Sequence, residues 1–358
     1  MTPRFVVSQP PECVMKIGLA LYPRHLPYRP EPLEELYGSF LDNAVYAEEL
    51  GYSHVWMGEH HFSPDAWPPS TLVLLTHVAA RTSRIRLGTG MLLMPFHHPL
   101  RVAEDAIVLD VLSHGRLDLG FSVGSAFHEY RTFNVPMSER LGRTQEGVEV
   151  VRRCFTEDRF DHHGKYYDFP DVRMEWYRPV QRPHPPIWIG AFGPKAFAWA
   201  GRNGYHINLG YTPLYEQVYL PALEAAGHDP RQAMLNQLVY CHVAPTRTQA
   251  WDEAEEGFRW VIEYYQTMTG APGISDAGPL PPGTLPPLGE FRNTPGIGFG
   301  GKFIVGTPDD LTRHLEQVAK TPATHVALAL GVAGMSKEQM RRSMELIAER
   351  VLPRFHDT

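Results

Sequence analysis

Short runs of apolar and β-branched residues recur along the whole chain, each bounded by glycine, proline or polar residues. Such runs predict buried β-strands, and nearly continuous apolar strands are typical of parallel α/β proteins. Eight segments have this pattern: residues 16–22, 54–58, 85–94, 117–123, 187–191, 206–209, 238–243 and 325–330.

Between these runs, apolar residues return at three- and four-residue spacings, which is the period of an amphipathic helix. This pattern covers residues 33–50, 70–82, 99–113, 139–155, 194–203, 214–226, 247–266 with 308–319, and 336–351. Strands that alternate with helices in this way predict an α/β fold of the (β/α)8 class, a TIM barrel. Catalytic groups are then expected at the C-terminal ends of the strands.

Two insertions interrupt this alternation. Residues 161–167 predict a tight hairpin, and a proline-rich segment follows at 178–186. Residues 270–301 contain 9 glycines and 7 prolines in 32 positions, a composition that resists regular structure. A loop of this length predicts a mobile lid that becomes ordered with substrate. Residues 15–358 are expected to form one barrel domain, and residues 1–14 a flexible tail.

The composition, 43% hydrophobic and 20% charged, is that of an ordinary globular protein. The net charge is −7 and neither lysine nor arginine forms a run, which argues against nucleic acid and anionic membrane as partners. A small-molecule substrate is expected instead. The three cysteines lack a Cys-x-x-Cys spacing. We expect no signal peptide and no membrane span, because residues 1–14 have no long apolar core and no run approaches 18 apolar residues. A cytoplasmic protein is therefore expected.

Candidate chemistry gathers at the ends of four predicted strands. Strand two ends in Glu-His-His-Phe at 59–62, strand three contains glycines, strand four ends in Gly-Phe-Ser-Val-Gly-Ser at 120–125, and strand five leads into Gly-Ala-Phe-Gly-Pro-Lys at 190–195. Free N–H groups at the helix start after strand five could hold a phosphate. Each pattern taken alone is more often a matter of packing than of ligand binding.

The histidine pairs His60-His61 and His97-His98 raise the question of a metal site. Adjacent strand residues point to opposite faces, so a barrel metal site would prefer His-x-His spacing, which neither pair has. No metal is therefore expected, and a metallohydrolase is a weak alternative.

Several of these segments, taken in order, resemble one family. They are Gly-Glu-His-His-Phe at 58–62, Arg-Leu-Gly-Thr-Gly at 86–90, His-Pro-Leu-Arg-Val-Ala-Glu-Asp at 98–105, Ser-His-Gly-Arg-Leu-Asp-Leu-Gly at 113–120, Val-Gly-Thr-Pro at 305–308 and Val-Leu-Pro-Arg-Phe at 351–355. The chain is similar over residues 15–355 to the bacterial luciferase-like flavin-dependent monooxygenases. This resemblance implies that reduced FMN and O2 form a C(4a)-peroxyflavin, which oxygenates a small organic substrate. It also implies a separate NAD(P)H:flavin reductase and a homodimer that pairs through the helices after strands two and three.

The resemblance also implies roles for individual residues. His60 matches the active-site histidine, Ser122 falls where the luciferase catalytic subunit has a reactive cysteine near the flavin, and Arg140 matches an arginine that binds the flavin phosphate. The peptide bond between Gly90 and Met91 is expected to be cis. The other expected cofactor contacts are Met57, Thr89, Gly90, Met91, Ser122, Gly190, Ala191, Phe192, Gly193 and Lys195.

The chain departs from the family pattern around the phosphate. Val123 stands in place of a second phosphate-binding arginine, and Phe192, Gly193 and Ala196 replace acidic and hydroxyl residues after strand five. The N–H groups of this turn, together with Lys195, are expected to compensate.

Two other functions stay open at this point. A deazaflavin-dependent oxidoreductase would move a hydride on the same barrel without oxygen chemistry. A non-catalytic subunit like the luciferase β chain would bind no flavin, although His60 and Arg140 argue against it. Aldehydes, ketones, amines and aromatic compounds all remain candidate substrates.

Overall fold

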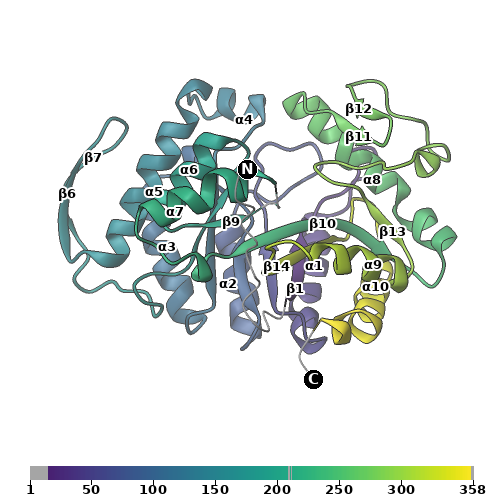
Figure 1. The fold of residues 1–358 in the computed structure, drawn as a ribbon, viewed down its shortest axis with the longest axis horizontal. Helices are drawn as coiled ribbons and strands as arrows, with labels where there is room; N and C mark the ends of the chain where they lie inside the picture. Colours follow the sequence, from purple (N-terminus) through teal and green to yellow (C-terminus); the bar gives the residue numbers. More distant parts are fainter. Residues whose placement is uncertain (1–14, 209, 211, 356–358) are drawn as a thin grey trace, which may run out of the picture.

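The centre of the molecule is a closed barrel of parallel strands (Figure 1). The computed structural model describes residues 15–355 except residues 209 and 211. In order around the barrel, the strands are β1 (Lys16–Leu21), β2 (His54–Met57), β3 (Arg86–Thr89) with β4 (Leu92–Leu93), β5 (Leu117–Ser122), β8 (Ile187–Gly190), β9 (His206–Asn208), β10 (Leu235–Val243) and β14 (His325–Leu330). The barrel closes because β14 pairs with β1 and β10 pairs with both β9 and β14. The predicted TIM barrel is confirmed.

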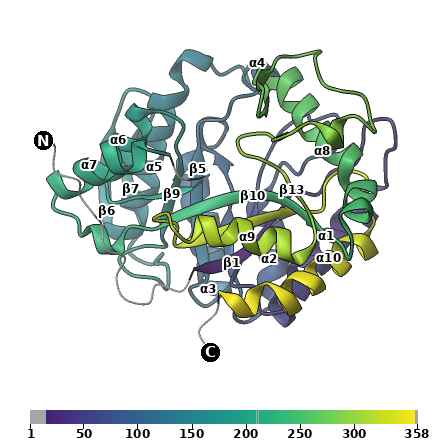
Figure 2. The same ribbon diagram turned by 45° about the vertical axis from the view of Figure 1, so that its right-hand side comes forward.

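The helices lie outside the strands (Figure 2). They are α1 (Leu33–Glu49), α2 (Thr71–Arg81), α3 (Pro99–Leu112), α4 (Phe127–Thr132), α5 (Arg140–Thr156), α6 (Pro194–Arg202), α7 (Leu220–Ala225), α8 (Arg247–Thr269), α9 (Pro308–Val318) and α10 (Lys337–Arg350). The local sequence determines where two of these helices begin, because α9 and α10 start with capping boxes on Thr307 and Ser336. Helix α4 was not predicted, since a helix this short shows no clear apolar period.

Alternate strand residues point into the barrel or toward the helices. Trp56 and Trp188 belong to the interior cluster and meet edge to face, with their ring centroids 5.3 Å apart. Val55 and Leu87 belong to the apolar layer between strands and helices. A side-chain carbon at Gly88 would lie 2.2 Å from the Trp56 ring, so this strand glycine makes room for an indole.

The third predicted strand, residues 85–94, is interrupted in the structure. It divides into β3 and β4 at the peptide bond between Gly90 and Met91, which is cis as predicted. The N–H of Gly90 donates to the carbonyl oxygen of Met57 at 2.7 Å, which holds the break against the end of β2. The break lies at the C-terminal end of the barrel.

Both insertions contain regular structure. Strands β6 (Arg159–His163) and β7 (Asp168–Arg173) form the predicted antiparallel hairpin. Within residues 270–301, β11 (Gly273–Ser275) and β12 (Gly278–Leu280) form a second hairpin, and Phe291 and Ile297 are buried. The expectation that this composition resists regular structure was therefore wrong for part of the segment, because the hairpin and two apolar side chains tie it to α8. Its mobility stays a prediction.

Two further observations concern the wider chain. Among the described residues, none of the helices combines the length and the apolar character that a bilayer-crossing segment needs. Cys154 and Cys241 are buried free thiols, and burial raises the pKa of Cys154 to about 12. The tail predicted at residues 1–14 lies outside the described residues.

Candidate active site

A cavity of about 310 Å³ opens at the C-terminal ends of the strands, where the sequence predicted the catalytic groups. The ends of β1, β2, β5 and β8, the middle of β10, the break between β3 and β4, and residues of α5 and α8 contribute to it. Its walls are Tyr22, Gly58, Glu59, His60, Trp67, Gly90, Met91, Leu93, Ser122, Val123, Gly124, Ser125, Met137, Arg140, Phe192, Leu238, Tyr240 and Tyr265. Mostly apolar walls with a few converging polar groups are typical of a cofactor site.

His60 is held by a carboxylate that the sequence analysis missed. Its Nδ1 lies 2.9 Å from Oε1 of Glu129, and the same oxygen accepts the N–H of His61 at 2.8 Å. Glu129 belongs to α4 and has no solvent exposure. A carboxylate accepts hydrogen bonds, so Nδ1 of His60 donates, and in the neutral imidazole Nε2 then carries the free lone pair. The ring edge packs on Trp67, with centroids 4.6 Å apart.

Glu59, His61 and His97 form a second cluster beside the cavity. Oε1 of Glu59 lies 3.1 Å from Nε2 of His61 and 2.7 Å from Nε2 of His97, and it also accepts the N–H of Leu93. Burial alone would raise the pKa of the Glu59 carboxyl, but the hydrogen bonds with the two imidazoles hold it at about 2. Burial lowers the pKa of His97, and its hydrogen bond with Glu59 outweighs that effect, so this pKa is raised.

This cluster corrects one step of the sequence argument. Neither histidine pair was expected to supply metal ligands, because adjacent residues point apart. The structure instead brings one histidine of each pair to Glu59, and the three ligand atoms lie within 4.8 Å of one another. The set is therefore capable of holding a metal ion, although the hydrogen bonds among the three side chains already account for its geometry.

The predicted site residues divide into two groups. His60, Ser122, Gly90, Met91, Arg140 and Phe192 line the cavity. The side chains of Met57 and Ala191 lie in the apolar layer outside the barrel, and Thr89 is tied to Gly120 by two hydrogen bonds. Gly190 is the last residue of β8, and Gly193 and Lys195 lie at the start of α6; these three residues do not line the cavity.

Aromatic side chains that the sequence analysis did not select form much of the wall. Tyr22, Trp67, Tyr240 and Tyr265 line the cavity from four separate parts of the chain. Burial raises the pKa values of Tyr240 and Tyr265, so both phenols are neutral donors. Tyr265 stacks on Phe299 with centroids 4.3 Å apart and an interplanar angle of 9°. The insertion at residues 270–301 thus supports the cavity wall.

Three features of the cavity bear on whether it could hold a flat ring that carries a phosphate. Gly58, Gly90 and Gly124 contribute only backbone to its walls. A side-chain carbon at Gly58 would lie 2.7 Å from the carbonyl oxygen of Gly90, so packing also requires glycine there. Arg140 begins the helix α5 and, among the described residues, has no acidic partner within 4 Å, so its guanidinium is available to a phosphate. Nε1 of Trp67 is a buried donor without a hydrogen-bond partner in the described structure.

Comparison with known proteins identifies the family. A sequence model of the family described as luciferase-like monooxygenase matches residues 15–325. The chain therefore belongs to the luciferase-like monooxygenase family, and the characterised relatives below are oxidoreductases.

Several relatives cover the chain to different extents. The 4-hydroxyprotoasukamycin monooxygenase of Streptomyces nodosus subsp. asukaensis is 28% identical over 96% of this chain and 92% of its own. The oxygenase component of the flavin-dependent trigonelline monooxygenase of Acinetobacter baylyi is 31% identical over 51% of this chain and 50% of its own length. An F420-dependent glucose-6-phosphate dehydrogenase of Kineococcus radiotolerans is 35% identical over 59% of this chain and 65% of its own. The last two matches thus span only part of each relative.

Solved structures agree with the fold. The monooxygenase RslO1 of Streptomyces bottropensis superimposes with a TM-score of 0.81 and 28% identity, covering 96% of this chain and 100% of its own. The oxygenating constituent of 3,6-diketocamphane monooxygenase of Pseudomonas putida, in complex with FMN, has a TM-score of 0.74 at 20% identity, covering 95% and 98%. At that identity the second likeness shows the fold alone.

Proposed function

We propose that this protein is the oxygenase of a two-component flavin-dependent monooxygenase that uses reduced FMN and O2 to oxygenate a small organic substrate. The observation that carries this proposal is the mostly apolar cavity that the oriented imidazole of His60 shares with the guanidinium of Arg140, which has no acidic partner among the described residues. Reduced FMN would supply the electrons for oxygen activation.

Each part of the cavity has a role in this proposal. Arg140 and the start of α5 would bind the flavin phosphate by charge-assisted hydrogen bonds. The aromatic walls would keep water away from the reacting atoms. Nε2 of His60 would accept or donate a proton there, because Glu129 fixes the other ring nitrogen. Ser122, at the end of β5, would offer a hydroxyl to the ring.

The same proposal includes partners. Reduced flavin would come from a separate NAD(P)H:flavin reductase, since the Acinetobacter relative is named as an oxygenase component. We also propose a cytoplasmic homodimer that pairs through α2 and α3. Val73, Val108, Val111 and Leu112 on these two helices expose 70%, 54%, 44% and 57% of their surface, and paired copies would cover them.

Residues 270–301 would act as a lid over this cavity. Phe291 and Ile297 anchor the segment, and Phe299 reaches the cavity wall through its stack on Tyr265. An anchored segment with exposed glycine and proline turns can open without unfolding the barrel.

A deazaflavin-dependent dehydrogenase is the second candidate, because the Kineococcus relative uses F420. One experiment separates the candidates: the protein is mixed anaerobically with reduced FMN and then with oxygen in a stopped-flow instrument. If it is an oxygenase, oxidised-flavin absorbance should return more slowly than oxygen is consumed, because the cavity shields the reacting flavin. Return as fast as in free solution, together with binding of reduced deazaflavin, would identify a dehydrogenase. Binding of neither would identify a non-catalytic subunit.

A further inference from the structure

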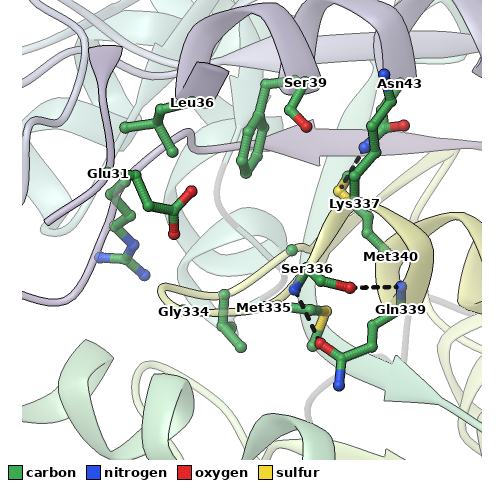
Figure 3. A pocket seen from close by; sticks show the side chains of 14 residues that line it. Glu31, Leu36, Ser39, Asn43, Gly334, Met335, Ser336, Lys337, Gln339 and Met340 are labelled. Atoms are coloured by element: carbon green, nitrogen blue, oxygen red, sulfur yellow. Dashed lines mark hydrogen bonds between the residues drawn. The ribbon is translucent and has the colours of Figure 1, made fainter. Parts of the chain in front are cut away.

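A second cavity, of about 300 Å³, opens between the loops that follow β1 and β14 (Figure 3). Polar groups in its wall already bond to one another. The N–H of Ser336 donates to Oε1 of Gln339 at 2.8 Å, and the N–H of Gln339 donates to the hydroxyl oxygen of Ser336 at 3.2 Å. Nδ2 of Asn43 lies 3.1 Å from the sulfur of Met340. These contacts fix the start of α10 against α1 and account for the polar groups that make them.

The cluster of Glu59, His61 and His97 is different, because its ligand atoms converge. Each side chain offers one such atom, and the three lie within 4.8 Å of one another; no other described residues gather in this way. Nε2 of His61 and Nε2 of His97 lie 3.1 and 2.7 Å from Oε1 of Glu59. Around a tetrahedral Zn²⁺, with bonds of about 2.0–2.1 Å, ligand atoms lie about 3.3 Å apart. A small outward movement of the carboxylate would therefore make room for an ion.

Glu59 is a buried carboxylate whose charge is poorly balanced. It is 3% exposed, and its ion-pair partners among the described residues are the two histidines, which carry charge only when protonated. Oε1 accepts three hydrogen bonds, whereas Oε2 is buried and has no hydrogen-bond partner in the described structure. Buried charges are normally paired or bound to metal. A cation on Oε1 would neutralise a charge that both oxygens share, so Oε2 need not reach it.

Neighbouring groups hold the two imidazoles in place. The ring of His61 meets that of Phe133 edge to face, with centroids 4.8 Å apart, and the backbone N–H of His61 donates to Glu129. The N–H of His97 donates to the carbonyl oxygen of Met94 at 3.1 Å. Ligands that are already oriented lose little freedom when an ion binds.

The cluster also has a way in for an ion. The side chains of Glu59 and His61 are 1% and 9% exposed, but that of His97 is 27% exposed. One edge of the cluster therefore reaches solvent while the other two ligands are buried. An ion can enter on the side of His97.

The donor set selects among cations. Imidazole nitrogen suits Zn²⁺ and its transition-metal neighbours, whereas Mg²⁺ and Ca²⁺ prefer oxygen ligands throughout. Two histidines and one glutamate are a donor set that Zn²⁺ uses in proteins, with a fourth position left to water. The set therefore favours Zn²⁺ over the hard divalent cations.

We propose that Glu59, His61 and His97 form a binding site for a divalent transition-metal ion, with Zn²⁺ as the expected occupant. The ion would join the loop after β2 to the segment after β4. Each imidazole would present the lone pair of Nε2, so a proton held there without metal would move to Nδ1 or leave to solvent. The inference goes beyond the proposed monooxygenase function and does not depend on it, because it can be tested without flavin.

The test is a calorimetric titration with Zn²⁺ of tag-free, flavin-free protein that has first been treated with a chelator. Wild-type protein should bind one ion per chain at this site, and Mg²⁺ should bind far more weakly. His97→Gln and Glu59→Gln should bind Zn²⁺ at least about a hundredfold more weakly, since loss of even an outer-shell partner typically costs about 10–100-fold. His98→Gln is the matched control. His98 is exposed, adjacent to His97 and outside the cluster, so this variant should bind as the wild type does.

Two further measurements keep the test valid if a variant does not fold. Zn²⁺ should raise the urea midpoint of unfolding of the wild type and of His98→Gln, because the site exists only in the folded protein, and should leave His97→Gln unchanged. In the wild type alone, Co²⁺ should bind to the same ligands and develop the visible absorption of a protein-bound ion with few water ligands.

Several results would overturn the proposal. They are absence of Zn²⁺ binding in the wild type, equal affinity in His97→Gln, and an equal loss of affinity in His98→Gln, which would place the ion on the surface. Binding of Mg²⁺ as tight as that of Zn²⁺ would exclude the imidazoles as ligands. A Co²⁺ spectrum identical to that of the hydrated ion would do the same.

Discussion

Replacing Glu129 by alanine tests how the imidazole of His60 is held. The variant would leave two buried donors, Nδ1 of His60 and the N–H of His61, without the oxygen that now accepts them at 2.9 and 2.8 Å. Each unsatisfied buried donor costs about 1–3 kcal/mol, so the free energy of unfolding should fall by about 2–6 kcal/mol. This is a large part of the roughly 5–15 kcal/mol that stabilises a typical domain.

Glu129→Gln separates stability from chemistry. Both donors use the same oxygen, Oε1, while Oε2 has no hydrogen-bond partner in the described structure. An amide can therefore keep both hydrogen bonds with its oxygen and lose only the negative charge. We expect the glutamine variant to unfold near the wild-type urea concentration and to bind reduced flavin normally. Its turnover should nevertheless fall, because the imidazole loses its charged partner.

Glu139→Ala is the matched control, since Glu139 makes a partly exposed ion pair with Arg143 at 2.8 Å. Such pairs contribute about 0–1 kcal/mol, so this variant should unfold almost as the wild type does. The measurements are urea unfolding for stability and stopped-flow oxidation of bound flavin for chemistry. If Glu129→Ala is no less stable than Glu139→Ala, and its flavin reacts as in the wild type, then Glu129 does not position His60.

Four further predictions follow from the same geometry. His60→Ala should retain its fold and most flavin affinity while turnover of the substrate falls by about 10²–10⁴; His61→Ala should lose more stability than activity, and the reverse pattern would move the active site to His61. Arg140→Ala should weaken binding of reduced flavin about ten- to a hundredfold, measured by anaerobic titration, and unchanged affinity would remove its phosphate role. The Glu59–His97 pair should make stability depend on pH at both ends. Glu59 adds to the free energy of unfolding above its ordinary pKa of 4.5, and this contribution is lost as the pH falls toward its folded-state pKa of about 2. His97 adds to the free energy of unfolding below its ordinary pKa of 6.5, and this contribution is lost as the pH rises through its raised folded-state pKa. In His97→Gln, the free energy of unfolding measured with urea should depend less on pH at both the acidic and the basic end. An unaltered pH dependence would show that the pair is not coupled to folding. Light scattering should give the mass of two chains, and the mass of one chain would reject the dimer.

The sequence predicted the barrel because its signal is local and repeated. Each strand is a short apolar run and each helix has its own period, so the order of elements could be derived one segment at a time. Even the break at Gly90 was foreseen, from family resemblance. Some boundaries moved by a few residues: β10 begins at Leu235 and not at residue 238, and α8 ends at Thr269 and not at residue 266.

The site was harder to predict, because it depends on contacts between distant segments. Glu129 lies in a six-residue helix without a clear apolar pattern, so nothing in its surroundings marked it as a partner for His60. Glu59 and His61 are two residues apart and share a side of the chain, but only the folded barrel shows that His97 completes their cluster. The tyrosines of the cavity wall come from the residue after β1, from β10 and from α8, and closure of the barrel is what brings them together.

The central claim is that the cavity at the C-terminal ends of the strands binds reduced FMN for oxygen chemistry. The most direct measurement is an anaerobic titration of the wild-type protein with reduced FMN and, separately, with reduced F420, followed by flavin fluorescence. We expect saturable binding of reduced FMN and weaker binding of the reduced deazaflavin. Oxidised FMN should be released only after oxygen is admitted. Tight binding of reduced F420 with no binding of reduced FMN would contradict it.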